Sequence, residues 1–362
     1  QRDIMKHLKL PEEQLPNLNL STLGTEYAWL ANAFPNPVQT FHEIADEITA
    51  DELTEYLTGK SDNTAAGLSK LKIGLIRDLD DSGVKALIAL FNACLVTGTI
   101  PSSWKKIIIV PLPKKHHITS LLDTRPISLL ECCLKILTGI INKRTLACWV
   151  KYKTLHPAQY AFLPGTSSAD PVHITRCIYE ISNERTKQKI IESPDCSTFI
   201  HVAYLDIAKA YDSVEHTALN FAMRSLGVPE GVLSLLLDID KGCSVQTRTP
   251  HGLSPEAPLG RGARQGDPLS CIRFNAFMNG LLRHLDTAKV GWALDADNRL
   301  HAQLFADDSF LAAASKDDLQ VLLSLTHQFF SFFKIRANYT KSYYSSNDPE
   351  ADGTVYLRNS ED

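Results

Sequence analysis

Two apolar segments of this chain each end in aspartate, and that restricts how the chain can fold. The run from Phe199 to Leu205 leads into Asp206, and the run LFA leads into the adjacent pair Asp307 and Asp308. Short apolar runs bounded by polar residues are typical of buried β-strands. If the two strands pair side by side, three carboxylates meet, and such a cluster repels itself unless cations neutralise it.

A hairpin turn is the simpler explanation for an acid pair, because the short aspartate side chain tolerates turn dihedrals and caps its own backbone. The pair Asp317 and Asp318 has such a local explanation, since it follows Ser315 in a capping box before an apolar helical pattern. For Asp307 and Asp308, the third acid, Asp206, in a similar strand-end setting favours a cation-binding site over a simple turn. Carboxylates select hard cations such as Mg²⁺, and a pair of ions suits phosphoryl transfer.

The chain has 362 residues, of which 44% are hydrophobic, so it can bury a sizeable core in two or three lobes. Its longest aliphatic runs, such as 107–110, are far shorter than the roughly 18 residues of a membrane helix, so we expect no membrane partner. The eight cysteines form no CxxC pair, which indicates reduced thiols and an intracellular protein. The start, which lacks methionine and a signal peptide, suggests a fragment of a longer protein.

Charge alone does not indicate nucleic-acid binding, because the formal net charge is only −4. Its distribution is more informative. Between Pro101 and Lys153 there are ten Lys or Arg residues against two acids. This segment could face a polyanion, although a solvated basic face is the commoner cause of such a run.

Strand and helix patterns alternate along the chain, which predicts an α+β fold without an internal repeat. Ser128 with Glu131 fits a capping box for the helix that follows, and Asp307 with Asp308 fits a turn between two strands. The expected elements are a helix from Asp81 ended by Gly98, a strand 107–112, a helix 215–226 ended by Gly227, a helix from Pro229, a hairpin within 243–263, a helix from Asp267 to about Leu285, and strands 300–306 and 309–313.

Six motifs occur in one order along the chain. They are KK at 114–115, RPISL at 125–129, QYAFLPG at 159–165, LDIAKAYD at 205–212, RQGDPLS at 264–270 and FADD at 305–308. In this order and approximate spacing, from about Asn92 to Lys341, the chain closely resembles the reverse transcriptase domain of non-LTR (LINE-type) retrotransposons. Each motif is weak by itself, whereas six in sequence are very specific.

The resemblance implies a right-hand polymerase fold with fingers and palm, in which an antiparallel palm sheet is backed by helices. It implies an N-terminal extension at 1–60, fingers with the start of the palm at 61–195, and the palm at 196–345. A tail at 346–362 leaves too few residues for the helical thumb. The endonuclease and thumb of the retroelement polyprotein are expected elsewhere in it.

The resemblance also implies the catalytic residues. Asp206, Asp307 and Asp308 match the family's metal-binding carboxylates, which hold two Mg²⁺ ions, with Mn²⁺ as an alternative. Lys341 resembles a lysine that protonates the leaving pyrophosphate, although a solvated lysine is an equal alternative. The implied reaction is attack of a primer 3′-hydroxyl on the α-phosphate of a dNTP.

Further motif positions match the family's substrate-binding residues, and the implied partners are an RNA template, a DNA primer and dNTP. Tyr211 matches the aromatic residue that packs under the sugar and excludes a 2′-hydroxyl. Gln265 and Gly266 match a segment that contacts nucleotide and template, and Arg125 matches a triphosphate-binding position, a role suited to the guanidinium fork. Either Lys114 or Lys115 matches a second cation at the triphosphate.

Departures from the family pattern leave alternatives open. The segment SDNTAAGL at 61–68 keeps only Gly67 of an expected loop, and Arg273 on a helix suggests decay. The first hypothesis is an RNA-directed DNA polymerase from a retroelement, with action in the nucleus compatible with the sequence. The second is a catalytically decayed or domesticated remnant that binds nucleic acid, and the third is a group II intron or another cellular polymerase of this fold.

Overall fold

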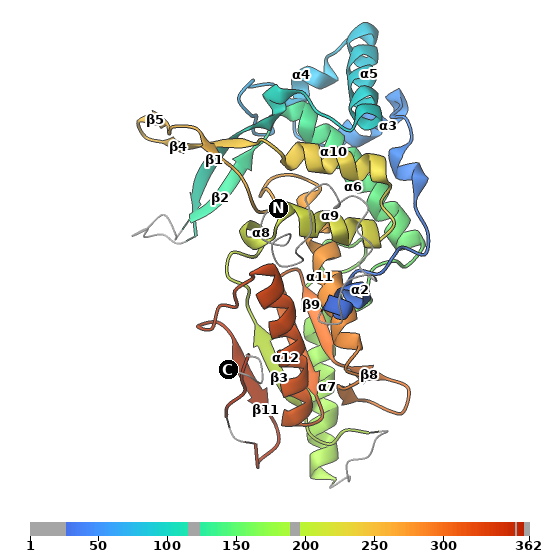
Figure 1. The fold of residues 1–362 in the computed structure, drawn as a ribbon, viewed down its shortest axis with the longest axis vertical. Helices are drawn as coiled ribbons and strands as arrows, with labels where there is room; N and C mark the ends of the chain where they lie inside the picture. Colours follow the sequence, from blue (N-terminus) through green and yellow to red (C-terminus); the bar gives the residue numbers. More distant parts are fainter. Residues whose placement is uncertain (1–26, 115–123, 189–195, 352, 358–362) are drawn as a thin grey trace. The chain divides into compact units, whose positions relative to one another are not determined.

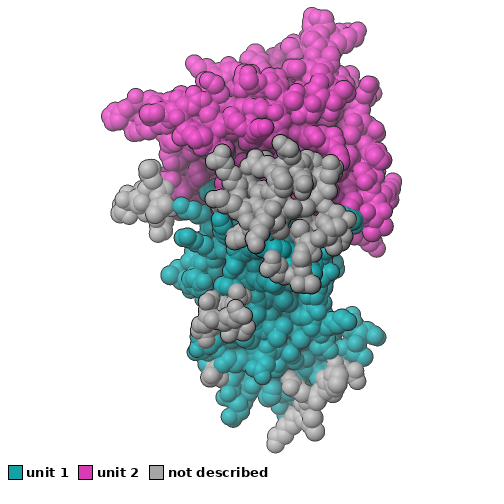
Figure 2. All heavy atoms as spheres, in the orientation of Figure 1, with its two compact units in different colours: residues 1–36, 155–214, 275–362 teal, residues 37–154, 215–274 magenta. Residues whose placement is uncertain are grey.

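A computed structural model describes residues 27–114, 124–188, 196–351 and 353–357. The chain divides into two compact units, each made of segments that are discontinuous in sequence (Figure 2). Unit 1 comprises residues 1–36, 155–214 and 275–362, and unit 2 comprises residues 37–154 and 215–274.

Unit 1 is built on a four-stranded antiparallel sheet in the order β11-β3-β10-β9, so strands distant in sequence become neighbours (Figure 1). A separate two-stranded sheet joins β7 to β8. The elements are α2 (Ala28–Ala33), α7 (Ala169–Lys187), β3 (His201–Leu205), α8 (Ala210–Ser213), α11 (Ser270–Asp286, in unit 1 from Asn275), β7 (Trp292–Ala293), β8 (Arg299–Leu300), β9 (Ala302–Phe305), β10 (Asp308–Ala313), α12 (Lys316–Phe333) and β11 (Tyr343–Ser346).

The two faces of this sheet are covered differently, because side chains alternate along each strand. On one face Val202, Phe310 and Ala312 pack against Ile178 of α7 in a buried cluster. Helix α12 packs along β3 and β10 and crosses in front of the sheet in Figure 1. The expected α+β class, with an antiparallel sheet backed by helices, is confirmed.

Helix α12 starts where its capping box predicts. The Ser315 hydroxyl accepts a hydrogen bond from the backbone N–H of Asp318 (3.1 Å), which satisfies a free donor of the first turn. The other end buries Phe329 and Phe333, which contact Phe277 of α11 with ring centroids 5.1 and 5.0 Å away. Aromatic packing of this kind fixes α11 and α12 against one another.

Unit 2 combines a sheet of order β2-β1-β4-β5, in which β6 also pairs with β4, with several helices. Strands β1 and β4 run parallel, and the other pairs are antiparallel. The elements are η4 (His42–Ala45), α3 (Ala50–Leu57), α4 (Ile73–Arg77), α5 (Asp81–Thr97), η5 (Ser102–Lys105), β1 (Lys106–Pro113), β2 (Thr124–Leu129), α6 (Cys132–Lys151), α9 (His216–Ser225), α10 (Glu230–Asp240), β4 (Ser244–Thr249), β5 (Gly252–Leu253) and β6 (Ala257–Pro258).

Local signals in unit 2 are largely confirmed. Helix α5 ends at Gly98, whose φ of 65° is the left-handed conformation that glycine adopts easily. Pro111 and Pro126 oppose one another within the β1–β2 ladder, beyond the residues of β1 that pair with β4. Prolines are tolerated there because that part of the ladder lies at a sheet edge.

Three local expectations are wrong. Ser128 does not cap α6, because it lies in β2 opposite Ile109, and the Glu131 carboxylate instead accepts a hydrogen bond from the backbone N–H of Ser69 (3.0 Å). Helix α11 begins at Ser270 rather than Asp267, and the turn between β9 and β10 is Ala306–Asp307, so that Asp308 is already the first residue of β10. For Ser128, pairing with the distant strand β1 overrides the local pattern.

Candidate active site

The sheet of unit 1 brings the two aspartate-bearing strand ends together. Leu205 pairs with Ser309 across the neighbouring strands β3 and β10. The next residues outward, Asp206 and Asp308, therefore lie at the same end of these two strands. Asp308 also pairs with Phe305 across the β9–β10 turn, which places Asp307 in the turn itself. The three acids named by the sequence therefore meet in one region of unit 1.

Asp206 is held by residues that follow α12. Its Oδ2 accepts a hydrogen bond from Asn338 Nδ2 (2.8 Å) and lies 3.5 Å from Lys341 Nζ. The backbone of Asp206 is bound to the same segment, because Asn338 N donates to the Asp206 carbonyl (2.7 Å) and Asp206 N donates to Ser342 Oγ (3.2 Å). Both side-chain contacts fall on Oδ2, so Oδ1 is the oxygen that faces away from them.

Burial and neighbouring negative charge raise the proton affinity of Asp307 and Asp308. Burial is the main cause that raises the pKa of Asp307 above its usual value, and the charges of Asp308 and Asp206 add to it, while Lys341 opposes it. Burial and Asp206 likewise raise the pKa of Asp308, again opposed by Lys341. Among the described residues Lys341 is the cation that acts on these acids, and with 67% of its side chain exposed it leaves the cluster with an excess of negative charge.

A cavity of about 540 Å³ opens beside the acids within unit 1. Its lining includes the charged side chains of Asp206, Asp308 and Lys341 together with Tyr204 and Tyr343. The two tyrosine rings stack across β3 and β11 with centroids 4.5 Å apart. The cavity therefore combines charged groups with a flat aromatic surface, a combination suited to a ligand that has both a polar group and a planar ring.

The predicted substrate-binding residues lie in both units. Tyr211 is half-buried on α8 of unit 1, which follows Asp206 closely in sequence. In unit 2, Arg125 is exposed on β2 opposite Leu112 of β1, and Lys114 follows directly after β1. Lys115 lies outside the described residues.

Gln265 and Gly266 form a loop that packs against β2 of unit 2. The Gln265 carbonyl accepts a hydrogen bond from Ser128 N (2.7 Å). Gly266 has a φ of 126°, and a Cβ at this position would lie 2.6 Å from the Ser128 carbonyl oxygen. Only glycine fits there, and the loop is thereby fixed on the strand that carries Arg125.

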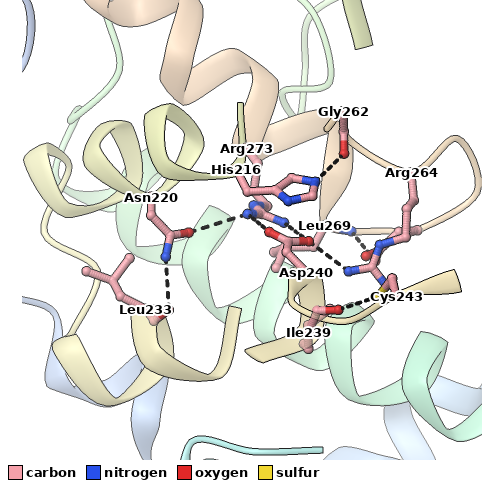
Figure 3. Close-up of polar contacts among 11 residues, drawn as sticks. His216, Asn220, Leu233, Ile239, Asp240, Cys243, Gly262, Arg264, Leu269 and Arg273 are labelled. Atoms are coloured by element: carbon pink, nitrogen blue, oxygen red, sulfur yellow. Dashed lines mark hydrogen bonds and ion pairs between the residues drawn. The ribbon is translucent and has the colours of Figure 1, made fainter. Parts of the chain in front are cut away.

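A second charged cluster, buried in unit 2, involves the same motif (Figure 3). Asp240 Oδ1 accepts from Arg264 Nη2 (2.8 Å), and its Oδ2 accepts from Arg273 Nη2 (2.5 Å). Arg273 also donates to Asn220 Oδ1 (3.3 Å). Burial alone would raise the pKa of Asp240, but Arg273, His216 and Arg264 hold it below the usual range. Arg273 therefore has a structural partner and is no sign of decay.

The sequence-based reasoning missed four functional candidates. Asn338 and Asp240 have partners far away in sequence, and Gln159 was noted only as part of a motif. A fourth group joins His156, Asp286 and His301, whose ligand atoms lie within 4.8 Å of one another and could hold a metal ion. His156 Nδ1, however, accepts from Ala158 N (3.1 Å), so its Nε2 carries the proton and donates toward Asp286. That arrangement favours a hydrogen bond between His156 and Asp286 over a metal centre.

All eight cysteines are free thiols, as their spacing predicted. Among the helices of the described residues, none is both long and apolar enough to cross a lipid bilayer.

Comparison with known proteins gives consistent matches. The family model "Reverse transcriptase (RNA-dependent DNA polymerase)" matches residues 112–356. The chain is 30% identical over 260 residues to the Retrovirus-related Pol polyprotein from type-2 retrotransposable element R2DM of Drosophila melanogaster, covering 71% of this chain and 23% of that protein. It is 24% identical over 301 residues to the RNA-directed DNA polymerase from mobile element jockey of the same species, covering 81% and 31%.

The chain thus spans about a quarter to a third of the length of these relatives. A structure of telomerase from Candida tropicalis in complex with a TWJ fragment of telomeric RNA aligns with 75% of this chain and 46% of that one, at 11% identity and a TM-score of 0.48. That similarity is too low to bear on function.

Proposed function

This chain belongs to the reverse transcriptase (RNA-dependent DNA polymerase) family, and we propose that it copies an RNA template into DNA by adding nucleotides to a primer 3′-hydroxyl. The resemblance to non-LTR retrotransposon polymerases is confirmed, since its relatives include R2 and jockey proteins. The meeting of Asp206, Asp307 and Asp308 at one end of an antiparallel sheet is the observation that carries the proposal.

Divalent metal ions serve this family, and the acids of unit 1 fit them. Carboxylate oxygens are the hard donors that Mg²⁺ prefers. The raised pKa values of Asp307 and Asp308 reflect burial and excess negative charge, which a bound cation would relieve. We propose that Asp206 and Asp307 hold two Mg²⁺ ions and that Asp308 supports them. When bound, such ions stabilise the attacking and leaving oxygens of an in-line displacement.

Asn338 and Lys341 prepare Asp206 for this role. The amide of Asn338 fixes Oδ2, which directs the other carboxylate oxygen toward a ligand. The Lys341 ammonium, 3.5 Å from the same oxygen, brings a mobile proton donor to the site, and we assign it the protonation of the leaving pyrophosphate. Its high exposure leaves it free to turn toward a bound substrate.

We propose that the cavity beside the acids receives the primer end. A nucleotide has both groups that the cavity suits, because its 3′-hydroxyl would lie at Asp206 and Asp308 while its base and sugar contact Tyr204. Tyr211 is proposed to pack against the sugar of the incoming dNTP and to exclude a 2′-hydroxyl.

In unit 2 we propose a triphosphate-binding surface. Arg125 and Lys114 project from the same end of the β1–β2 ladder, where two cations can neutralise phosphate oxygens. The Gln265–Gly266 loop is fastened to β2 through Ser128 and would contact the nucleotide and template. In family terms, we assign the acid-bearing sheet to the palm (196–345) and the β1–β2 ladder to the fingers (61–195).

The remaining parts of the proposal concern the complete polyprotein. The relatives are several times longer than this chain, so an endonuclease and a thumb are proposed to accompany it in the same polyprotein. Contacts to the template would be mainly to backbone phosphates and A-form shape, which makes affinity fall steeply with salt. We also propose that the protein acts in the nucleus.

Primer extension on poly(rA)·oligo(dT) with Mg²⁺ tests the activity directly. The wild type should incorporate dTTP, and Asp307→Ala should reduce incorporation by about 10³-fold, because several kcal/mol of transition-state stabilisation would be lost. A wild type that binds the duplex but incorporates nothing would refute the enzymatic proposal. Equal extension by both proteins would show that a contaminating polymerase is the source.

A further inference from the structure

The turn that carries Asp307 has an unfavourable backbone conformation. Ala306, its first residue, has a φ of 58°, in the left-handed region that residues with a Cβ rarely adopt. It is also buried, with 5% of its surface exposed. Glycine would adopt this conformation without strain, so an alanine here requires support from the surrounding structure.

The side chain of Gln159 supplies a specific contact to this turn. Its Oε1 accepts hydrogen bonds from the backbone N–H of Ala306 (3.2 Å) and of Ala161 (3.1 Å). Gln159 is 1% exposed. The carboxamide therefore joins the turn to the segment that contains Gln159, entirely within unit 1.

That segment is itself fixed by the backbone. Tyr160 N donates to the Leu304 carbonyl (2.9 Å), and Leu304 N donates to the Ala158 carbonyl (2.8 Å), so residues 158–160 extend the sheet next to β9. From the other side, Asn275 Nδ2 donates to the Ala161 carbonyl (2.6 Å). Gln159 is thus held on both sides before it reaches the turn.

The amide can occupy the site in one orientation only. A flipped side chain would place its NH₂ group against two N–H donors. In the orientation observed, Nε2 is buried and has no hydrogen-bond partner among the described residues. An unsatisfied buried donor is unfavourable, so its presence indicates that the oxygen of Gln159 has a role that outweighs this penalty.

We propose that Gln159 is a positioning residue, which holds the Ala306–Asp307 turn in the conformation that presents Asp307 and Asp308 to divalent metal. The inference rests on the proposed function, because it assigns the turn a part in metal binding. Gln159 itself contacts neither metal nor substrate. Its loss should therefore reduce kcat and weaken the response to Mg²⁺, while the KM for dNTP changes little.

The test compares Gln159→Met, which keeps side-chain length but removes the acceptor, with the wild type in primer extension. We expect kcat to fall by 10-fold or more, the Mg²⁺ concentration for half-maximal rate to rise several-fold, and the KM for dTTP to stay within 3-fold. The double variant Gln159→Met/Ala306→Gly should recover much of the loss, because glycine adopts the left-handed turn unaided. A purely structural role in the core would not be rescued in this way.

Gln328→Met is the matched control. Gln328 lies half-buried on α12, and its Oε1 is 3.0 Å from His284 Nε2, so the change also removes a hydrogen-bonded amide from unit 1. Its kcat and Mg²⁺ dependence should match the wild type within 2-fold. If Gln159→Met does not fold, Gln159→Asn, which withdraws the oxygen from Ala306 but stays polar, should show the same losses.

Wild-type kinetics in a folded Gln159 variant, or a loss that Ala306→Gly does not relieve, would overturn the role of Gln159 and leave the proposed polymerase activity intact. An inactive wild type would instead refute the proposed function. In that case Mn²⁺ binding to the intact chain, measured by calorimetry, still tests the inference, which predicts weaker binding by Gln159→Met than by the wild type.

Discussion

Unit 1 and unit 2 each contain aspartate in a charged cluster, but the two clusters are balanced in opposite ways. In unit 1, Asp307 and Asp308 lie with Asp206 near the exposed Lys341, and the pKa values of Asp307 and Asp308 are raised. In unit 2, Asp240 lies buried between two arginines, and its pKa is lowered. An acid that lacks compensating charge is available for a cation, whereas an acid that is fully paired serves the fold.

Both clusters nevertheless involve or adjoin residues to which we assign a part in the proposed polymerase reaction. Asp240 binds Arg264, which directly precedes the Gln265–Gly266 loop. We therefore interpret the difference as a division of labour, in which charge in unit 1 is left for ligands and charge in unit 2 fixes a loop. The same Asp→Asn change should then have opposite effects on stability in the two units.

The largest effect on stability is expected for Asp240→Asn. It removes the carboxylate that Arg264 and Arg273 share in the buried cluster. Removing one partner of a buried ion pair typically lowers the free energy of unfolding by about 3–5 kcal/mol, because a buried charge is left uncompensated. Urea denaturation would measure the loss. Asp62→Asn, which removes the partner of Arg77 at an exposed position, is the control and should change stability by less than about 1 kcal/mol. Equal effects of the two variants would contradict the view that Asp240 organises unit 2.

Asp307→Asn should change stability less and in the other direction. Removing one negative charge relieves repulsion in the acid cluster, so the melting temperature without divalent ions should rise by about 1–3 °C. The variant should also lose the additional stabilisation that Mg²⁺ gives the wild type. Differential scanning calorimetry with and without Mg²⁺ measures both. A fall in the metal-free melting temperature would show that the acids do not strain the site.

The smallest effect is expected for Asp286→Asn, an intermediate case in unit 1. Burial raises the pKa of Asp286, but hydrogen bonds from His156 and His301 outweigh it and bring the pKa below its usual value. Its stabilising contribution is therefore present above the ordinary carboxyl pKa and lost as the pH falls through the lowered value. Because 46% of the Asp286 side chain is exposed, the free energy of unfolding of the variant should be lower than that of the wild type by less than about 1 kcal/mol near pH 6.

Thermal melts of Asp286→Asn and the wild type from pH 6 to pH 2 provide the measurement. The difference between the two curves should shrink toward the acidic end, as the pH approaches the lowered pKa of the Asp286 carboxyl. A difference that stays constant over this range would mean that the charge of Asp286 contributes nothing.

The elements with local causes were predictable from the sequence. Ser315 caps α12, Gly98 ends α5, and the apolar runs before Asp206 and Asp307 form the strands β3 and β9, each of which pairs with β10 rather than with the other. Ser128 shows where such reasoning fails, because its capping pattern is real but pairing with Ile109 in β1 stabilises an extended backbone instead. Local patterns decide an element only where no distant partner competes for the same backbone groups.

The sequence by itself predicted which three acids meet at one end of the sheet, because motif order and strand-end position need no knowledge of packing. Only the tertiary structure decided what surrounds them. Asn338 binds Asp206 and Gln159 binds Ala306 across 132 and 147 residues. Arg273 finds Asp240 across 33 residues. Hydrogen bonds and ion pairs of this kind leave no periodicity in a sequence, since they depend on the close approach of side chains that folding alone brings about.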